Sequence, residues 1–197
     1  MPITIDGTGS IAGLAAGGLP DGTVTTADIA AGAVTQAKRS EQLTQGTAVA
    51  TTSGTSIDFT GIPSWAKRIT VMFNGVSTNG TSQPTIQLGT SGGVQTTGYS
   101  ANTTSITTGA NATTNYTNGW QIYSSLAANV FSGVLTLVQQ DAGSGVWVGT
   151  GLFSISIPGL IITSGTKTLS GTLDRVRITT ANGTDAFDAG SINILYE

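Results

Sequence analysis

Residues 47–197 alternate between apolar and polar positions with a period of two, the pattern of strands that bury one face. In the clearest case, Ile69, Val71 and Phe73 share one face of a predicted strand. The other predicted strands cover residues 86–88, 134–138, 153–157, 176–179 and 192–196. No long amphipathic helix is predicted, although residues 124–129 could form one helical turn. We therefore expect an all-β fold, an antiparallel jelly-roll-like β-sandwich of about eight or nine strands.

Asn-Gly pairs mark the expected turns between these strands. Both residues tolerate positive φ, so an Asn-Gly pair between apolar runs predicts a two-residue hairpin. The pairs occupy positions 74–75, 79–80, 118–119 and 182–183. Pro158 follows the strand at 153–157, and because proline cannot donate a ladder hydrogen bond, we expect that strand to end there.

Residues 1–46 have a different texture, because they contain no aromatic residue and are rich in Gly, Ala and Thr. A degenerate ten-residue repeat aligns residues 22–29 with residues 32–39. The apolar residues of this segment are isolated; those expected at a trimer axis are Val24, Ile29 and Val34. One copy cannot bury them, whereas copies wound about a common axis would bring each to its symmetry mates.

Two parts follow from these textures: an extended, mostly irregular segment over residues 1–46, which we expect to trimerise, and a β-sandwich domain over residues 47–197. The expected assembly is a homotrimer. The alternative is that residues 1–46 form a flexible leader, which their Gly and Ala content would also suit.

Charged residues make up only 9% of the chain, against about 25% in ordinary domains, so its polar character rests on hydroxyls and amides. The net charge is −3 and the basic residues form no cluster, which argues against nucleic acid as a partner. No apolar run reaches the ~18 residues that span a bilayer, and no signal-peptide pattern begins the chain. We expect no membrane insertion, no cofactor and no metal. Weak binding of calcium at Asp185-x-x-Asp188 is the alternative to the absence of a metal.

The chain has neither histidine nor cysteine, which excludes Ser-His-Asp and Cys-His catalysis. A pair of carboxylates could still cleave a glycan if the two lay at the right separation. The candidates are Asp141, Asp174, Asp185 and Asp188. Aspartates of this kind more often hydrogen-bond local backbone at turns and hairpin ends, so we expect a protein that is not an enzyme.

Three stretches, residues 18–35, 62–77 and 187–197, resemble in order the N-terminal linker, the opening of the C-terminal β-domain and the terminal strand of phage and prophage tail fibre proteins. The resemblance implies a homotrimer joined to other tail proteins through its N-terminus and located in the virion. It also implies that residues 1–46 are an attachment segment and that residues 47–197 are a receptor-binding domain that attaches to the host cell surface. A capsid or tail decoration or adaptor protein without a receptor is the alternative, and a glycan depolymerase is a further one.

A surface for a host glycan is predicted between residues 99 and 120, where aromatic rings and amides occur without any charged residue. Sugars stack their C–H groups on aromatic faces, while amides and hydroxyls bind their rims. The predicted receptor-binding residues are Tyr99, Asn102, Asn111, Asn115, Tyr116, Asn118 and Trp120. The alternative is that Tyr116 and Trp120 anchor a hairpin into the sandwich.

Overall fold

The structure is a computed structural model that describes residues 25, 27, 29, 30, 43–109, 111–141, 143–156 and 159–197. The chain divides into two units, residues 1–40 and residues 41–197. In the first unit Val24 and Val34 lie outside the described residues, and Ile29 is 42% exposed. In the second, strand pairing begins at Thr44, slightly before the expected boundary at residue 47.

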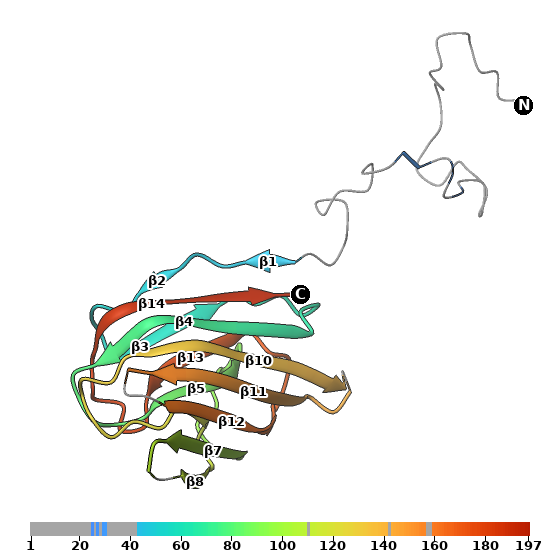
Figure 1. Cartoon of the computed structure of the whole chain (residues 1–197). Helices are drawn as coiled ribbons and strands as arrows, with labels where there is room; N and C mark the ends of the chain where they lie inside the picture. The colour runs from blue at the N-terminus through green and yellow to red at the C-terminus, as the bar shows by residue number, and fades with distance from the viewer. Residues whose placement is uncertain are drawn as a thin grey trace, which may run out of the picture. The chain divides into compact units, whose positions relative to one another are not determined.

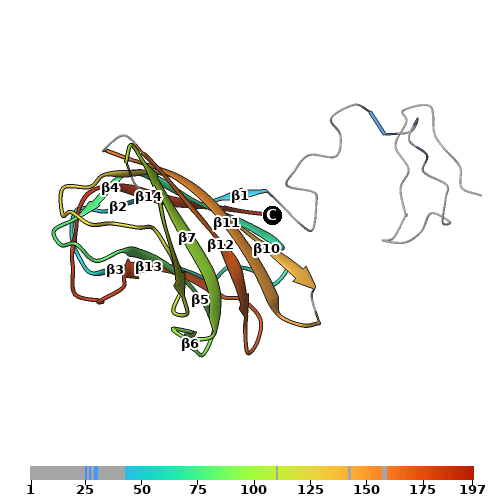
Figure 2. The same ribbon diagram turned by 60° about the horizontal axis from the view of Figure 1, so that its bottom comes forward.

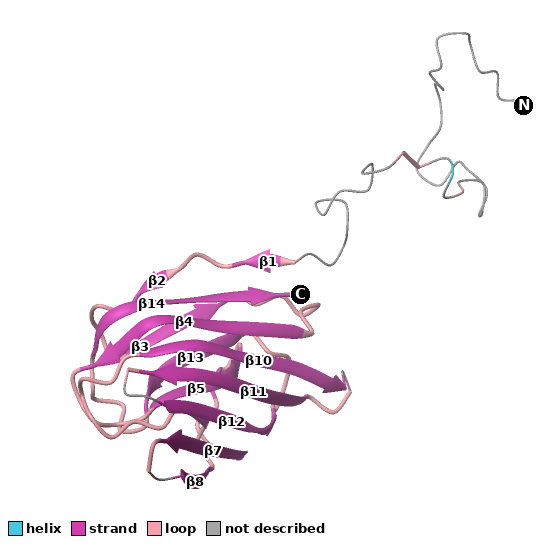
Figure 3. Cartoon of the chain, in the orientation of Figure 1, coloured by secondary structure: helices cyan, strands magenta, loops and turns pink. Residues whose placement is uncertain are grey.

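The second unit consists of two antiparallel sheets, and no α-helix occurs in the described residues (Figures 1 and 3). The large sheet runs in the order β1 (Thr44–Gln45), β14 (Phe187–Tyr196), β4 (Arg68–Thr78), β10 (Phe131–Asp141), β11 (Val146–Ile155), β12 (Gly159–Thr168), β7 (Tyr99–Thr107) and β8 (Asn111–Tyr116), with β2 (Val49–Ala50) also paired to β14. The small sheet runs in the order β3 (Ser56–Thr60), β13 (Arg175–Thr180), β5 (Pro84–Thr90) and β6 (Gly93–Val94), with β9 (Trp120–Gln121) also paired to β5.

The two sheets face each other and enclose one apolar core (Figure 2). The predicted alternation is confirmed on β4, where Ile69, Val71 and Phe73 are at most 4% exposed. The ring of Phe73 meets that of Phe153 on β11 edge to face, with centroids 5.3 Å apart. An all-β, sandwich-like fold with antiparallel sheets is therefore what the period-two pattern correctly indicates.

The predicted Asn-Gly hairpins are wrong, because none of the four pairs joins two adjacent strands of one sheet. Asn74-Gly75 lies inside β4, where Gly75 has a φ of 65° next to a register irregularity between β4 and β10. The pairs at 79–80, 118–119 and 182–183 lie where the chain passes from one sheet to the other. In these Asn-Gly pairs, positive φ occurs at the irregularity inside β4 and at the turn from the small sheet to the large sheet, where Gly183 has a φ of 70°.

Candidate functional site

A polar groove lies on the outer face of the small sheet, and its floor is built from the registers of three strands. Alternation along β13 sends Val176 and Ile178 into the core, so Arg177 and Thr179 point outward. Arg177 is directly paired with Asp58 on β3 and with Gln87 on β5. Residues distant in sequence thereby form one row across the sheet.

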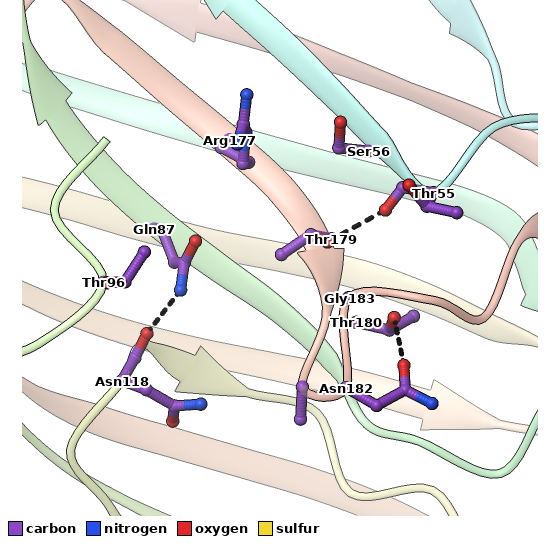
Figure 4. A pocket seen from close by; sticks show the side chains of 11 residues that line it. Thr55, Ser56, Gln87, Thr96, Asn118, Arg177, Thr179, Thr180, Asn182 and Gly183 are labelled. Carbon is purple, nitrogen blue, oxygen red and sulfur yellow. Dashed lines mark hydrogen bonds between the residues drawn. The ribbon is translucent and has the colours of Figure 1, made fainter. Parts of the chain in front are cut away.

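Thr96 and Asn118 lie beside Gln87 in the groove, while Thr55 and Ser56 lie across β13 from them (Figure 4). The groove has a volume of about 350 Å³ and is lined by Thr55, Ser56, Gln87, Thr96, Asn118, Arg177, Thr179, Thr180, Ala181, Asn182 and Gly183. None of these lining residues, all within the described ranges, is aromatic. The volume is near the lower end of small-ligand pockets, which span roughly 300–1,000 Å³.

Three hydrogen bonds hold the groove's wall and floor together. The Gln87 Nε2 donates to the Asn118 carbonyl oxygen at 2.7 Å, and Gln121 Nε2 donates to the Asn118 Oδ1 at 2.7 Å. The Thr179 hydroxyl donates to the Thr55 carbonyl oxygen at 2.9 Å. These contacts fix the positions of an amide and a hydroxyl before any ligand arrives, which lowers the entropic cost of binding.

Arg177 and Asp58 form a bidentate ion pair, with Nε–Oδ1 and Nη2–Oδ2 both at 2.7 Å. Its hydrogen bonds with Asp58 raise the pKa of Arg177 above its ordinary value. The two side chains remain 36% and 32% exposed, so the pair contributes only about 0–1 kcal/mol to stability. The guanidinium charge is compensated, and the groove offers a ligand neutral hydrogen-bonding groups beside a paired charge.

The structure separates the residues predicted to form one receptor surface. Tyr99 and Trp120 belong to the core, with 3% and 0% of their surface exposed. Their rings pack edge to face at 5.3 Å, and the Tyr99 hydroxyl donates to the Gln95 carbonyl oxygen at 2.8 Å. Neither ring is available for stacking on an external sugar, which agrees with the alternative in which Trp120 is an anchor. Tyr116, on edge strand β8, is half-buried.

The predicted amides divide between two surfaces. Asn102, Asn111 and Asn115 are exposed at the β7–β8 edge of the large sheet, where Asn115 Nδ2 donates to Asn102 Oδ1 at 3.3 Å. Asn118 alone among the predicted residues lines the groove of the small sheet. Sequence reasoning missed Arg177, although the alternation of Val176 and Ile178 was a signal that Arg177 faces outward beside its neighbouring strands.

Each of the aspartates considered for catalysis has a hydrogen-bonding or ionic partner. Asp174 pairs with Arg175 at 2.9 Å, and Asp141 accepts a hydrogen bond from the Ser144 backbone N–H at 2.9 Å. Asp185 accepts from the Ser82 N–H at 2.9 Å, and Asp188 accepts from the Ser77 hydroxyl. Of these contacts, the one made by Asp141 is the local backbone bond expected of a turn aspartate. Asp185 and Asp188 instead bond to residues 103 and 111 positions away along the chain.

Within the described residues, no group of three or more Asp, Glu, His or Cys side chains is arranged to hold a metal ion. The same residues contain no helix that is long and apolar enough to cross a membrane. No protein-family model, curated protein or solved structure matches the chain.

Proposed function

We propose that this chain is a structural protein of a phage tail fibre, located in the virion, that attaches to a glycan on the host surface and binds it without cleaving it. The observation that carries the binding proposal is the groove on the small sheet, lined by hydroxyls, amides and one compensated guanidinium. Hydroxyl and amide groups both donate and accept hydrogen bonds, as sugar hydroxyls do, so a neutral oligosaccharide suits them.

We further propose a jelly-roll organisation of the sandwich. The strand orders β2-β14-β4-β10 and β3-β13-β5-β9 support it, because successive long strands such as β3, β4 and β5 cross from sheet to sheet. Such crossing is typical of two interlocked Greek keys.

The proposed assembly is a homotrimer, joined to other tail proteins through residues 1–46. A groove without an aromatic platform binds one sugar chain weakly. Three grooves on one particle would engage a repeating surface glycan together, and such linkage raises avidity by about 10²–10⁴-fold. The trimer and the absence of stacking rings in the groove are thus compatible with firm attachment.

The test compares Arg177→Met with Arg175→Met in the full chain. Both arginines face outward on β13 and pair with an aspartate, but Arg175 does not line the groove. We expect Arg177→Met to weaken binding to host lipopolysaccharide or capsule at least about tenfold, which equals about 1.4 kcal/mol. Arg175→Met should bind like the wild type, and both variants should melt within a few degrees of it.

Equal binding by the two variants would refute the groove as the glycan site. Release of new reducing ends from the same glycan would refute binding without cleavage and favour a depolymerase. A wild-type protein that binds no host glycan and lies on the capsid by cryo-electron microscopy would favour the decoration or adaptor role.

A further inference from the structure

The outer face of the large sheet carries branched aliphatic side chains that no part of the described sandwich covers. They project from the central strands β10, β11 and β12 and from β7, and are between 39% and 50% exposed. The residues are Ile106, Val134, Val138, Val148, Leu152, Leu160 and Ile162. Together they expose apolar surface on the order of 500 Å², divided into smaller patches by intervening hydroxyl side chains.

The strand registers arrange these side chains in bands. One band runs across four strands in the order Met72, Val134, Leu152 and Ile162. The next band toward the opposite end of the strands consists of hydroxyls, namely Thr70, Thr136, Thr150 and Ser164. Beyond it, Val138 is directly opposite Val148. Apolar and hydroxyl bands therefore alternate along the strands.

This face is also nearly free of charge. Within the described ranges, the outward positions of β11 and β12 hold only aliphatic and hydroxyl side chains, and β10 adds the amide of Gln140. Charged side chains lie at one end of the face, where Asp141 of β10 is opposite Val146 and Arg68 of β4 is opposite Val138. An antiparallel sheet facing water normally carries polar and charged residues on that side. Depletion of charge with retention of aliphatic side chains is instead typical of the centre of a protein interface.

We propose that copies of this chain pack against one another through the outer face of the large sheet, which we call the banded face. Five strands of about ten residues cover an area on the order of 30 Å by 20 Å, comparable to the ~800 Å² that each partner contributes to a stable interface. The inference rests on the proposed self-association, but not on the glycan groove, which lies on the other sheet.

A copy of the same chain is the partner that the chemistry favours. Hydroxyls donate and accept, so a threonine band can hydrogen-bond to its own counterpart, which bands of like charge cannot do. The chain carries a net charge of −3, and copies of it repel one another least where the contacting surface is uncharged. A different protein would more commonly be recognised through complementary charges, which the centre of this face does not offer.

The first test is the mass of the full chain in solution, measured by sedimentation over a range of concentrations. The wild type should give a multiple of 19.8 kDa. Leu152→Glu, at the centre of the banded face, should weaken association by about 100-fold or more, because each copy would bury an unpaired carboxylate. Thr60→Glu is the control, since it adds the same charge on exposed strand β3 of the small sheet; its mass should remain that of the wild type.

Cross-linking provides a second readout that does not depend on tolerance of a charge. The chain contains no cysteine, so Leu152→Cys introduces a single reactive thiol. A short bis-maleimide should then give covalent dimers of the full chain, whereas Thr60→Cys should give none. If circular dichroism shows that Leu152→Glu fails to fold, cross-linking of Leu152→Cys tests the proposed contact in its place.

A wild-type protein that is a folded monomer at all concentrations would overturn the proposal. An oligomer that Leu152→Glu leaves intact would also overturn it and would assign the contact to another surface, such as residues 1–46. Binding of a short glycan fragment that occupies only one groove should be unchanged in Leu152→Glu. Loss of this binding only in Arg177→Met separates failure of the groove from failure of the banded face.

Discussion

The sharpest stability prediction concerns the packing of Trp120 against Gly149. Gly149 faces inward on β11, and Trp120 reaches it from the small sheet with no exposed surface. A Cβ atom at position 149 would lie 2.6 Å from both Cε2 and Nε1 of the indole and 2.9 Å from Leu137 Cδ2. Gly149→Ala therefore forces one methyl group into a space that the ring already fills.

The size of the effect follows from two opposing contributions. Carbon atoms pack best at about 3.5–4.0 Å, so the indole or the strand must move by about 1 Å. Overpacking of this kind costs roughly 1–3 kcal/mol in a close-packed interior. Replacing glycine by alanine in a strand returns about 0.5–1 kcal/mol of backbone entropy. We expect a net loss of about 1–2 kcal/mol, or a fall in Tm of about 2–8 °C for a chain of this size.

Urea and thermal unfolding at one fixed protein concentration measure this loss. Gly171→Ala is the control, because the nearest atom to its added Cβ is Thr90 Cγ2 at 3.6 Å, an ordinary contact. That variant should be as stable as the wild type or slightly more stable. The tryptophan fluorescence of the chain, to which Trp120 contributes together with Trp65 and Trp147, should change in Gly149→Ala and stay constant in Gly171→Ala.

A double-mutant cycle with Trp120→Phe isolates the contact. The smaller ring leaves room for the methyl group, so Gly149→Ala should cost less than half as much in that background. The indole N–H of Trp120 has no acceptor in the described structure, so its removal leaves no acceptor unpaired. If Gly149→Ala is as stable as the wild type, or costs the same in both backgrounds, the steric account is refuted.

Two further predictions concern buried hydroxyls. Burial raises the pKa of Tyr99 above its ordinary value of 10.0. Above about pH 10, this tyrosine therefore ionises in the unfolded chain but not in the folded chain. The free energy of unfolding then falls by about 1.4 kcal/mol per pH unit. Tyr99→Phe should lack this dependence in urea unfolding across about pH 9–11, and identical slopes would contradict it. Thr103→Val should lower the free energy of unfolding by about 1–3 kcal/mol. The Thr103 hydroxyl donates to the Gln121 carbonyl oxygen at 2.7 Å, and the residue is only 2% exposed. Thr104→Val, on the same strand but facing outward, should cost less than about 0.5 kcal/mol, and equal losses would argue against burial as the cause.

The strands with strong apolar alternation were predictable from the sequence alone. Five of the six predicted segments lie within strands, among them β4, β10 and β14. The sixth, 153–157, overlaps β11 as far as Ile155, and its expected end at Pro158 lies outside the described residues. Period two is a local property of the extended backbone, so it needs no knowledge of the partner strands. The absence of histidine and cysteine likewise limits the chemistry whatever the fold is.

Strands β7 and β8 were not predicted, because their inward positions are small or polar. On β7 the buried side chains after Tyr99 are Ala101, Thr103 and Ser105, so burial alternates while hydrophobicity does not. The space that Trp120 needs is provided by Gly149, which belongs to a strand of the other sheet. Neither the burial of these small and polar residues nor the contact between Trp120 and Gly149 can be predicted from the sequence without the assembled sheets.

The candidate surfaces depended wholly on tertiary structure. Asp58 and Arg177 are 119 residues apart, and only the insertion of β13 between β3 and β5 brings them into one row with Gln87. The banded face similarly requires the order β4-β10-β11-β12 and its register. A shift of one residue in any strand would exchange its inner and outer faces, so local alternation determines which residues share a face, and pairing across the sheet determines which surface they form.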